Sequence, residues 1–231
     1  FQFYGANRTG RWSSRMIQLQ NLPQNHMKDL DLARSMVEKG DYDLIEMCYG
    51  NIPNVLSELI RTAFIAPEGK MFAVADFSAI EARVLSWLAQ EKWRLDVFNT
   101  HGKIYEASAS LMFGVPIEQV TKGSDLRQRG KTAELALGYE GSVNAMEKMD
   151  KEKKLSKKEM YSIVALWRRA NPKIVEFWAE VNEKAIECVQ TRKTKKVSCL
   201  VFEHDGTNLT IALPAGRKLY YRNPRVRPNR F

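Results

Sequence analysis

The sequence predicts an α+β fold that is mostly helical, and three observations carry the prediction. Apolar residues recur at helical spacing over much of residues 28–189. A short apolar run at residues 71–75, bounded by Pro67-Glu68-Gly69, reads as a buried strand. Towards the C-terminus the period becomes that of strands, and Asp205-Gly206 predicts a hairpin turn.

The elements follow in order along the chain. Residues 1–25 are polar and read as a loop. Helices are predicted over residues 28–49 with a break at Gly40, 55–62, 79–88 with Ser78 as a possible N-cap, 103–113, 125–139, from 156 to the Asn171-Pro172 step, and 172–189. Ser156-x-x-Glu159 has the pattern of a capping box. Residues 148–158 form a mixed-charge, solvated loop, and residues 197–202 and 209–213 form the hairpin strands.

Composition fits one large or two small globular domains. The 231 residues are 44% apolar and 10% aromatic, which argues against intrinsic disorder. No run of 18 apolar residues and no signal peptide is found, so we expect a cytoplasmic protein without a membrane partner. The chain begins at Phe1, so we expect a piece of a longer protein. Its three cysteines, Cys48, Cys188 and Cys199, match no zinc template and are expected to be reduced thiols.

The positive charge is concentrated near the C-terminus. Residues 190–231 hold ten Lys or Arg and two acids, whereas the rest of the chain is nearly neutral. A basic end on a neutral body fits a polyanionic partner, and a solvated basic tail explains it equally well. If this region binds DNA phosphates, its affinity should fall steeply with salt.

Asp76 is the first candidate for chemistry. It follows the predicted buried strand and precedes the helix that carries Glu81 and Arg83. A carboxylate at such a strand end can hold Mg²⁺, which prefers oxygen ligands and keeps room for substrate phosphates. The alternative is that Asp76 only caps the helix.

A second candidate is the series Arg127-x3-Lys131-x3-Leu135-x3-Tyr139. Steps of four keep these residues on one helical face, within about 120°. Two cations beside a leucine and a tyrosine suit a nucleoside triphosphate. An amphipathic helix with two surface cations is the alternative.

A third candidate lies in the N-terminal loops. Thr9-Gly10-Arg11-Trp12-Ser13-Ser14 and Gln18-Leu19-Gln20-Asn21-Leu22-Pro23 offer amides, hydroxyls and an arginine, which can contact phosphates and minor-groove acceptors. Taken alone, each is also compatible with an ordinary polar loop.

Together and in this order, these motifs resemble those of family A DNA polymerases, and most closely the phage and prophage branch. The resemblance extends over nearly all of the chain. It includes further stretches, namely Leu59-Ile60-Arg61-Thr62-Ala63, Ala63-Phe64-Ile65-Ala66-Pro67, Glu91-Lys92-Trp93-Arg94-Leu95-Asp96-Val97, Gly102-Lys103-Ile104-Tyr105-Glu106 and Ala133-Glu134-Leu135-Ala136-Leu137-Gly138-Tyr139.

The resemblance implies roles for single residues. The Asp76 carboxylate and the Phe77 carbonyl would bind two catalytic Mg²⁺ ions, which activate the primer 3′-hydroxyl and stabilise the leaving pyrophosphate. Glu81, with Tyr139 as hydrogen-bond partner, would exclude ribonucleotides. The remaining roles are triphosphate binding by Arg127 and Lys131, with Lys131 also a candidate proton donor, sugar contact by Leu135, and DNA contact by Arg11, Gln20 and Asn21.

The sequence departs from the family pattern at several points. Tyr105 stands where bacterial relatives often have a phosphate-binding histidine. Glu140 replaces a common glycine and is expected to point away from phosphate. The later His-Asp motif is absent, because His204-Asp205 precedes Gly216-Arg217-Lys218-Leu219-Tyr220, a segment that comes before that motif in relatives. His204-Asp205 is therefore expected to be a hairpin turn.

The function implied is that of a DNA-directed DNA polymerase acting on primer–template DNA and dNTPs in replication. The expected right-hand architecture is incomplete: residues 1–102 as part of the palm, with a small antiparallel sheet that includes residues 71–76, residues 103–189 as helical fingers, and residues 190–231 as a basic hairpin region returning to the palm. Without the second carboxylate the chain alone is expected to be inactive, and an exposed edge strand could allow self-association. A non-catalytic nucleic-acid-binding fragment is one alternative. A single-subunit RNA polymerase is another, against which Glu81 argues.

Overall fold

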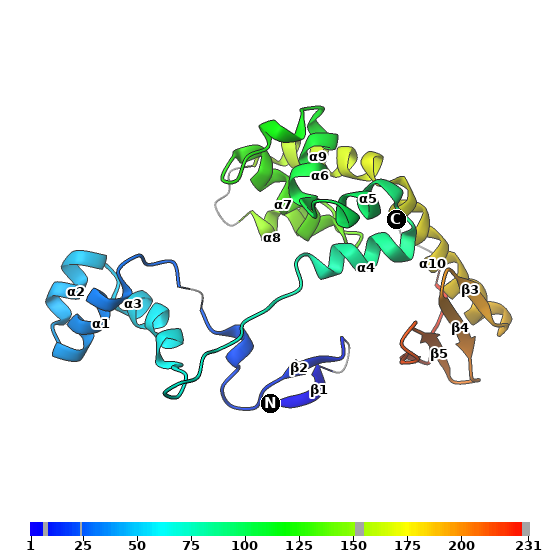
Figure 1. The fold of residues 1–231 in the computed structure, drawn as a ribbon. Coiled ribbons are helices and arrows are strands. Elements are labelled where there is room, and N and C mark those ends of the chain that lie inside the picture. Colours follow the sequence, from blue (N-terminus) through cyan, green and yellow to red (C-terminus); the bar gives the residue numbers. More distant parts are fainter. Residues whose placement is uncertain (7–8, 24, 151–154, 228–231) are drawn as a thin grey trace. The chain divides into compact units, whose positions relative to one another are not determined.

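A computed structural model describes residues 1–6, 9–23, 25–150 and 155–227. The chain divides into two compact units, Phe1–Asp76 and Phe77–Phe231, and each is described by itself. The described residues are mostly helical, with two small antiparallel sheets, which confirms the predicted α+β class (Figure 1). None of the helices in the described ranges is both long and apolar enough to cross a bilayer.

The first unit begins with a β-hairpin followed by a small helical cluster. Its elements are β1 (Gln2–Ala6), β2 (Arg11–Ser13), η1 (Leu19–Asn21), α1 (Leu30–Lys39), α2 (Tyr42–Tyr49), α3 (Ile52–Leu59) and η2 (Ile60–Ala63). The prediction of a loop over residues 1–25 was therefore wrong for the hairpin. The helices close on a core of Ala33, Met36, Ile45 and Val55.

Local sequence signals explain where these helices begin and end. Gly40 terminates α1 in the left-handed region at φ 72°, as its predicted break requires. The Asp41 and Asn51 side chains cap α2 and α3 by accepting from backbone N–H groups at 3.1 and 3.0 Å. The helix predicted over residues 55–62 is confirmed as α3 followed by η2.

The strand predicted at residues 71–75 is wrong. These residues have no regular secondary structure, and Met71, Phe72 and Val74 are 89%, 59% and 91% exposed. A strand forms only when a neighbour completes its hydrogen-bond ladder. Among the described residues, the two sheets consist of β1–β2 and β3–β6, and residues 71–76 pair with a strand of neither. The predicted palm sheet containing residues 71–76 is accordingly not formed in the described part of the chain.

The second unit is a helical body. Its helices are α4 (Ile80–Ala89), α5 (Lys92–Asn99), α6 (Ile104–Phe113), η3 (Ile117–Gln119), α7 (Asp125–Leu137), α8 (Val143–Met149), α9 (Lys157–Ala170) and α10 (Pro172–Thr191). The sequence predicted neither α5 nor α8. The last two residues of α8 overlap the predicted loop over residues 148–158, of which residues 151–154 lie outside the described ranges. The Ser156–Glu159 capping box is confirmed by reciprocal hydrogen bonds. The hydrophobic core of this helical body includes Leu137, Met146, Ile163, Trp167 and Ile174.

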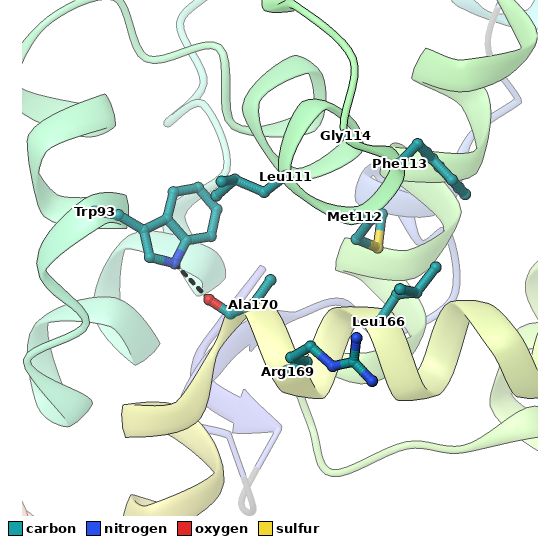
Figure 2. Close-up of a pocket in the computed structure, with 8 residues that line it drawn as sticks. All are labelled: Trp93, Leu111, Met112, Phe113, Gly114, Leu166, Arg169 and Ala170. Carbon is teal, nitrogen blue, oxygen red and sulfur yellow. Dashed lines mark hydrogen bonds between the residues drawn. The ribbon is translucent and has the colours of Figure 1, made fainter.

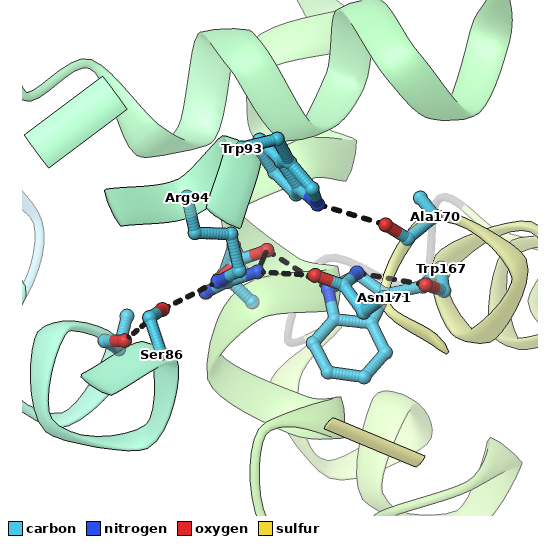
Figure 3. A network of polar contacts seen from close by, with 8 residues as sticks. Ser86, Trp93, Arg94, Trp167, Ala170 and Asn171 are labelled. Carbon is cyan, nitrogen blue, oxygen red and sulfur yellow. Dashed lines mark hydrogen bonds and ion pairs between the residues drawn. The ribbon is translucent and has the colours of Figure 1, made fainter. Parts of the chain in front are cut away.

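A polar network lies inside this body, and Figure 3 shows it. Arg94 from α5 has no exposed surface and forms a bidentate ion pair with Glu134 of α7. The remaining Arg94 donors reach Ser86 Oγ of α4 and Asn171 Oδ1 at the start of α10, at 2.8 and 2.9 Å. Trp167 Nε1 donates to Glu134 Oε1 at 2.8 Å. One guanidinium and one carboxylate thus connect α4, α5, α7, α9 and α10.

A four-stranded antiparallel sheet follows α10. Its strands, in order, are β3 (Lys195–Val197), β4 (Leu200–His204), β5 (Asn208–Ala212) and β6 (Lys218–Arg222). The β4–β5 hairpin with its turn at Asp205-Gly206 is confirmed. The single strand predicted over residues 197–202 is instead two strands joined at Ser198, whose φ of 51° permits the tight turn. Cys188 and Val189 of α10 cover the sheet together with Val181 and Ala185.

Candidate nucleotide-binding site

Asp76 and Phe77 lie at the boundary of the two units, in an exposed segment without regular structure. Asp76 does not cap α4, whose N-cap residue is Ala79 in the left-handed region at φ 50°, with no side-chain cap bond. The predicted Ser78 cap is therefore also wrong. Instead, Arg83 Nε donates to the Ser78 carbonyl oxygen at 2.9 Å. The Asp76 carboxylate and the Phe77 carbonyl are left open to solvent.

Arg83 itself is held from the other side. Its guanidinium carbon lies 4.5 Å from the centroid of the Phe98 ring of α5, a favourable cation–π distance. The turn that follows Asp76 is thus fixed to the helical body through Arg83. This arrangement gives the segment after Asp76 a defined start even though no strand precedes it.

One side of α7 is open and carries the predicted triphosphate residues. Arg127 and Lys131 are partly exposed, and Leu135 is 41% exposed. The other side is buried through Gly130, Thr132, Ala133, Glu134, Ala136 and Leu137. The helix ends at Leu137, two residues short of the prediction, so Tyr139 lies past its end and is 70% exposed. The stripe predicted from spacing is real for Arg127, Lys131 and Leu135, which we call the open face of α7.

Neighbouring groups set the charges along the open face. Arg127 Nε donates to Glu106 Oε1 of α6 at 2.7 Å, and the Arg127 guanidinium carbon lies 5.7 Å from the Tyr105 ring centroid. Burial raises the pKa of Glu106, but the hydrogen bond from Arg127 outweighs it, and the net pKa is below its usual range. Burial raises the pKa of Tyr105, which stays a neutral phenol. Within the described residues, the Lys131 ammonium has no hydrogen bond or ion pair.

Gly130 allows α7 to approach α6 closely. A methyl group at this position would overlap the Tyr105 carbonyl oxygen and lie 3.0 Å from Ala109 Cβ. The missing side chain therefore sets the spacing that brings Glu106 within reach of Arg127. The neighbouring carbonyl belongs to the backbone and cannot swing away.

Gly130→Ala is expected to lower the free energy of unfolding by about 1–2 kcal/mol. Overpacking against backbone costs about 1–3 kcal/mol, whereas alanine regains up to about 1 kcal/mol of helix propensity. Urea denaturation would measure the change, with Gln128→Ala as control because Gln128 is exposed on the same helix. A Gly130→Ala protein as stable as wild type would contradict the close packing.

The two residues predicted to select the sugar, Glu81 and Tyr139, lie at the ends of helices, as does Glu140. Glu81 lies in the first turn of α4 and is exposed. Tyr139 and Glu140 follow α7, and Glu140 is exposed with φ at 59°. All three belong to the second unit, as does the open face of α7.

The predicted DNA-contacting residues belong to the first unit. Arg11 is exposed on β2, and Asn21 Nδ2 in η1 donates to Gln18 Oε1 at 2.7 Å. Gln20 is also in η1, but its side chain lies outside what the structure describes. Arg61 of η2 donates to the carbonyl oxygens of Leu22 and Pro23 at 2.6 and 2.5 Å, which fixes the loop behind η1.

His204 and Asp205 are occupied by the hairpin turn. Asp205 Oδ1 accepts from the backbone N–H groups of Thr207 and Asn208 at 2.9 and 2.6 Å, and His204 Nδ1 accepts from Gly206 N at 3.0 Å. Hydrogen bonds from the Asn208 side chain and from the Asn208 and Thr207 backbone lower the pKa of Asp205 to about 2. The hydrogen bonds of the β4–β5 turn therefore explain why His204 and Asp205 stand at these positions.

Asp76 and Phe77 provide only part of the ligand set that a Mg²⁺ ion requires. Asp76 and Phe77 provide a carboxylate and a carbonyl oxygen, which suit Mg²⁺. Across the described ranges, however, no three His, Cys, Asp or Glu side chains come together as a metal site would require. The chain's own residues thus fit one edge of a magnesium site and not a whole one.

A hollow of about 520 Å³ lies elsewhere on the second unit (Figure 2). Trp93 of α5 borders it, with Nε1 donating to the Ala170 carbonyl oxygen at 2.8 Å. The rest of the lining comes from the end of α6 and from α9: Leu111, Met112, Phe113, Gly114, Leu166, Arg169 and Ala170. None of the predicted site residues lines this hollow.

Sequence reasoning missed Glu106, Arg94 and Glu134. Glu106 lies on α6, 21 positions before Arg127, and periodicity does not report such pairings. Glu134 did leave a signal, because a carboxylate between Ala133 and Ala136 interrupts the apolar side of α7. Such a residue in a buried stripe requires a cationic partner.

The chain is similar to known polymerases over most of its length. Residues 4–207 match the family model described as DNA polymerase family A. The chain is 55% identical to a DNA polymerase of Bacillus phage SP02 over 227 residues, which is 97% of this chain and 35% of the relative. It is 38% identical to DNA polymerase I of Pseudomonas aeruginosa over 91 residues, and 33% identical to the thermostable DNA polymerase I of Thermus aquaticus over 126 residues.

These matches cover unequal parts of the proteins compared. The Pseudomonas alignment includes 38% of this chain and 10% of the relative, and the Thermus alignment 54% and 14%. The chain thus spans about a third of the SP02 relative and less of the bacterial ones. Because the family model matches most of the chain, the chain belongs to DNA polymerase family A.

Proposed function

We propose that this chain supplies the nucleotide-binding helix and one metal-binding carboxylate of a template-directed DNA polymerase. The open face of α7 carries the proposal. Arg127 and Lys131 lie on the open face of α7, whose other side is buried, and the Lys131 ammonium has no hydrogen bond or ion pair within the described residues. Two adjacent cations beside the apolar Leu135 match a triphosphate joined to a sugar and base.

The other roles rest on the resemblance to family A polymerases. Asp76 and the Phe77 carbonyl would hold Mg²⁺, which activates the primer 3′-hydroxyl and stabilises the leaving pyrophosphate. Lys131 would bind the triphosphate and donate a proton to the pyrophosphate. Arg11, Gln20 and Asn21 would contact primer–template DNA. Residues 1–102 would then be part of the palm, residues 103–189 the fingers and residues 190–231 a hairpin returning to the palm.

One observation favours a second function for the isolated chain, namely binding without catalysis. A two-metal mechanism needs a cluster of carboxylates, and within the described residues no three His, Cys, Asp or Glu side chains come together as such a site would require. The chain alone is therefore proposed to bind primer–template DNA or nucleotide without extending a primer.

The test uses the chain alone and a hybrid polymerase. In the hybrid, this chain replaces the 227 aligned residues of the SP02 relative, which supplies the remaining segments. We expect Mg²⁺-dependent primer extension with dNTPs by the hybrid, and DNA binding without extension by the chain alone. A well-folded hybrid that binds primer–template and never extends it would contradict the proposal. Extension by the chain alone would reveal a second carboxylate within it, first of all Asp205.

Glu81→Ala in the hybrid is expected to increase ribonucleotide incorporation relative to deoxynucleotide incorporation by on the order of tenfold. Glu81 is exposed at the start of α4, so the change should leave folding intact. The ratio of kcat/KM for rNTP and dNTP measures the effect. Glu118→Ala serves as control, because Glu118 is exposed in η3. If the ratio in Glu81→Ala is the same as in Glu118→Ala and in the unmodified hybrid, Glu81 does not select the sugar. If the unmodified hybrid prefers rNTP to dNTP, the result favours an RNA polymerase.

A further inference from the structure

Arg127 uses only part of its hydrogen-bonding capacity. Its Nε donates to Glu106 Oε1 at 2.7 Å, and its terminal nitrogens have no hydrogen-bond partner within the described part of the chain. A guanidinium has five N–H donors in a planar fork. The edge formed by the two terminal nitrogens is therefore available, and this edge can grip two phosphate oxygens.

The Arg127–Glu106 contact is sheltered from solvent. The two side chains are 26% and 15% exposed, and the Tyr105 ring flanks the guanidinium. Shielding of this kind makes an ion pair more rigid than an exposed surface pair, whose average contribution is small. The contact with α6 is in turn permitted by Gly130, where the two helices nearly touch.

We propose that Glu106 is a positioning residue for the incoming nucleotide, because it fixes Arg127 through Nε and leaves the terminal nitrogens for the triphosphate. This inference rests on the proposed triphosphate-binding role of Arg127. Glu106 contacts the arginine and would not contact the phosphate, because both groups are negatively charged and repel each other. Its benefit is preorganisation: an arginine already held in place loses less side-chain freedom on binding.

The test measures binding to the full 231-residue chain by isothermal titration, with Mg²⁺-dATP and inorganic tripolyphosphate as probes. Glu106→Leu removes the acceptor, whereas Glu106→Gln keeps an oxygen that can accept from Nε. Arg127→Lys keeps the charge and removes the fork. Asp125→Asn is the matched control, because Asp125 accepts from Arg129 Nε at the same 2.7 Å and plays no part in holding Arg127. Thermal melts confirm that each variant is folded.

We expect Glu106→Leu and Arg127→Lys each to weaken binding of both probes by about tenfold. Glu106→Gln should retain most of the wild-type affinity, and Asp125→Asn all of it. Because Glu106 acts through Arg127, the Glu106→Leu change should cause no further loss in the Arg127→Lys background. A merely structural role would lower the melting temperature and leave the affinity of the folded protein unchanged.

The outcomes distinguish failure of the proposed Arg127 role from failure of the proposed Glu106 role. If Arg127→Lys leaves affinity unchanged, or if the wild-type chain binds neither probe, the proposed role of Arg127 fails and the inference falls with it. If Arg127→Lys weakens binding and Glu106→Leu does not, only the inference is overturned. Tighter binding by both Glu106 variants would make Glu106 a competitor of phosphate instead of a positioning residue. Equal losses from Glu106→Leu in both backgrounds would also refute it.

Discussion

Replacing Arg94 by methionine is expected to lower the free energy of unfolding by about 3–5 kcal/mol. Arg94 is fully buried and pairs with Glu134, whose side chain is 2% exposed. Loss of the guanidinium would leave that carboxylate in an apolar interior without its counter-charge. Ser86 and Asn171 would also lose a hydrogen-bond partner. Since a domain of this size is stable by about 5–15 kcal/mol, the change is large.

Chemical denaturation of the chain would measure the loss, and Arg129→Met is the matched control. Arg129 pairs with Asp125 and Glu159 at 2.7 and 3.1 Å, but its side chain is 26% exposed, so about 1 kcal/mol or less is expected. The double variant Arg94→Met with Glu134→Leu should recover part of the stability, because no charge is then left buried. Similar losses for Arg94→Met and Arg129→Met would show that the buried pair has no special importance.

The position of this pair connects stability with the candidate site. Glu134 lies on the buried side of α7, and Lys131 and Leu135 lie on the open face of the same helix. The network that holds Glu134 therefore fixes the rotation of α7 and with it the direction of the open face. A loosened network is expected to weaken nucleotide binding even though none of its members touches the nucleotide.

Several predictions that rest on local signals are confirmed, although the predicted Ser78 cap and the loop expected at β1 and β2 were wrong. Gly40 ends α1, Ser156 and Glu159 form their capping box, and Asp205-Gly206 turns the hairpin, because each depends on residues within one turn of the chain. Steps of four likewise identified the open face of α7, since helical periodicity alone places those residues together.

Prediction failed where the outcome depended on distant partners. The apolar residues 71–75 have strand character, but a strand forms only by pairing with another strand, and within the described residues they pair with none. Arg94 and Glu134 are 40 positions apart, and Glu106 and Arg127 are 21 apart, so neither pairing leaves a local pattern. The family resemblance assigned Arg127 a role without indicating what holds it.

Asp76→Asn in the hybrid polymerase is expected to reduce primer extension by about a thousandfold or more. An asparagine keeps the shape of the side chain and removes the charge that would hold Mg²⁺, whose stabilisation of the reacting oxygens is worth several kcal/mol, with each 1.36 kcal/mol a factor of ten. Asp76 is exposed and caps no helix, so the fold should not change. Single-turnover kinetics at saturating dNTP measures the effect.

Asp205→Asn is the control that makes this result informative. It removes the same charge, but the Asp205 carboxylate serves the β4–β5 turn, where its lowered pKa reflects three hydrogen bonds. We therefore expect a modest loss of stability and normal extension. If both variants extend normally, Asp76 is not a metal ligand and its position after residues 71–75 is incidental. If both abolish extension, Asp205 takes part in the reaction, and the hairpin must change conformation to release it from the turn.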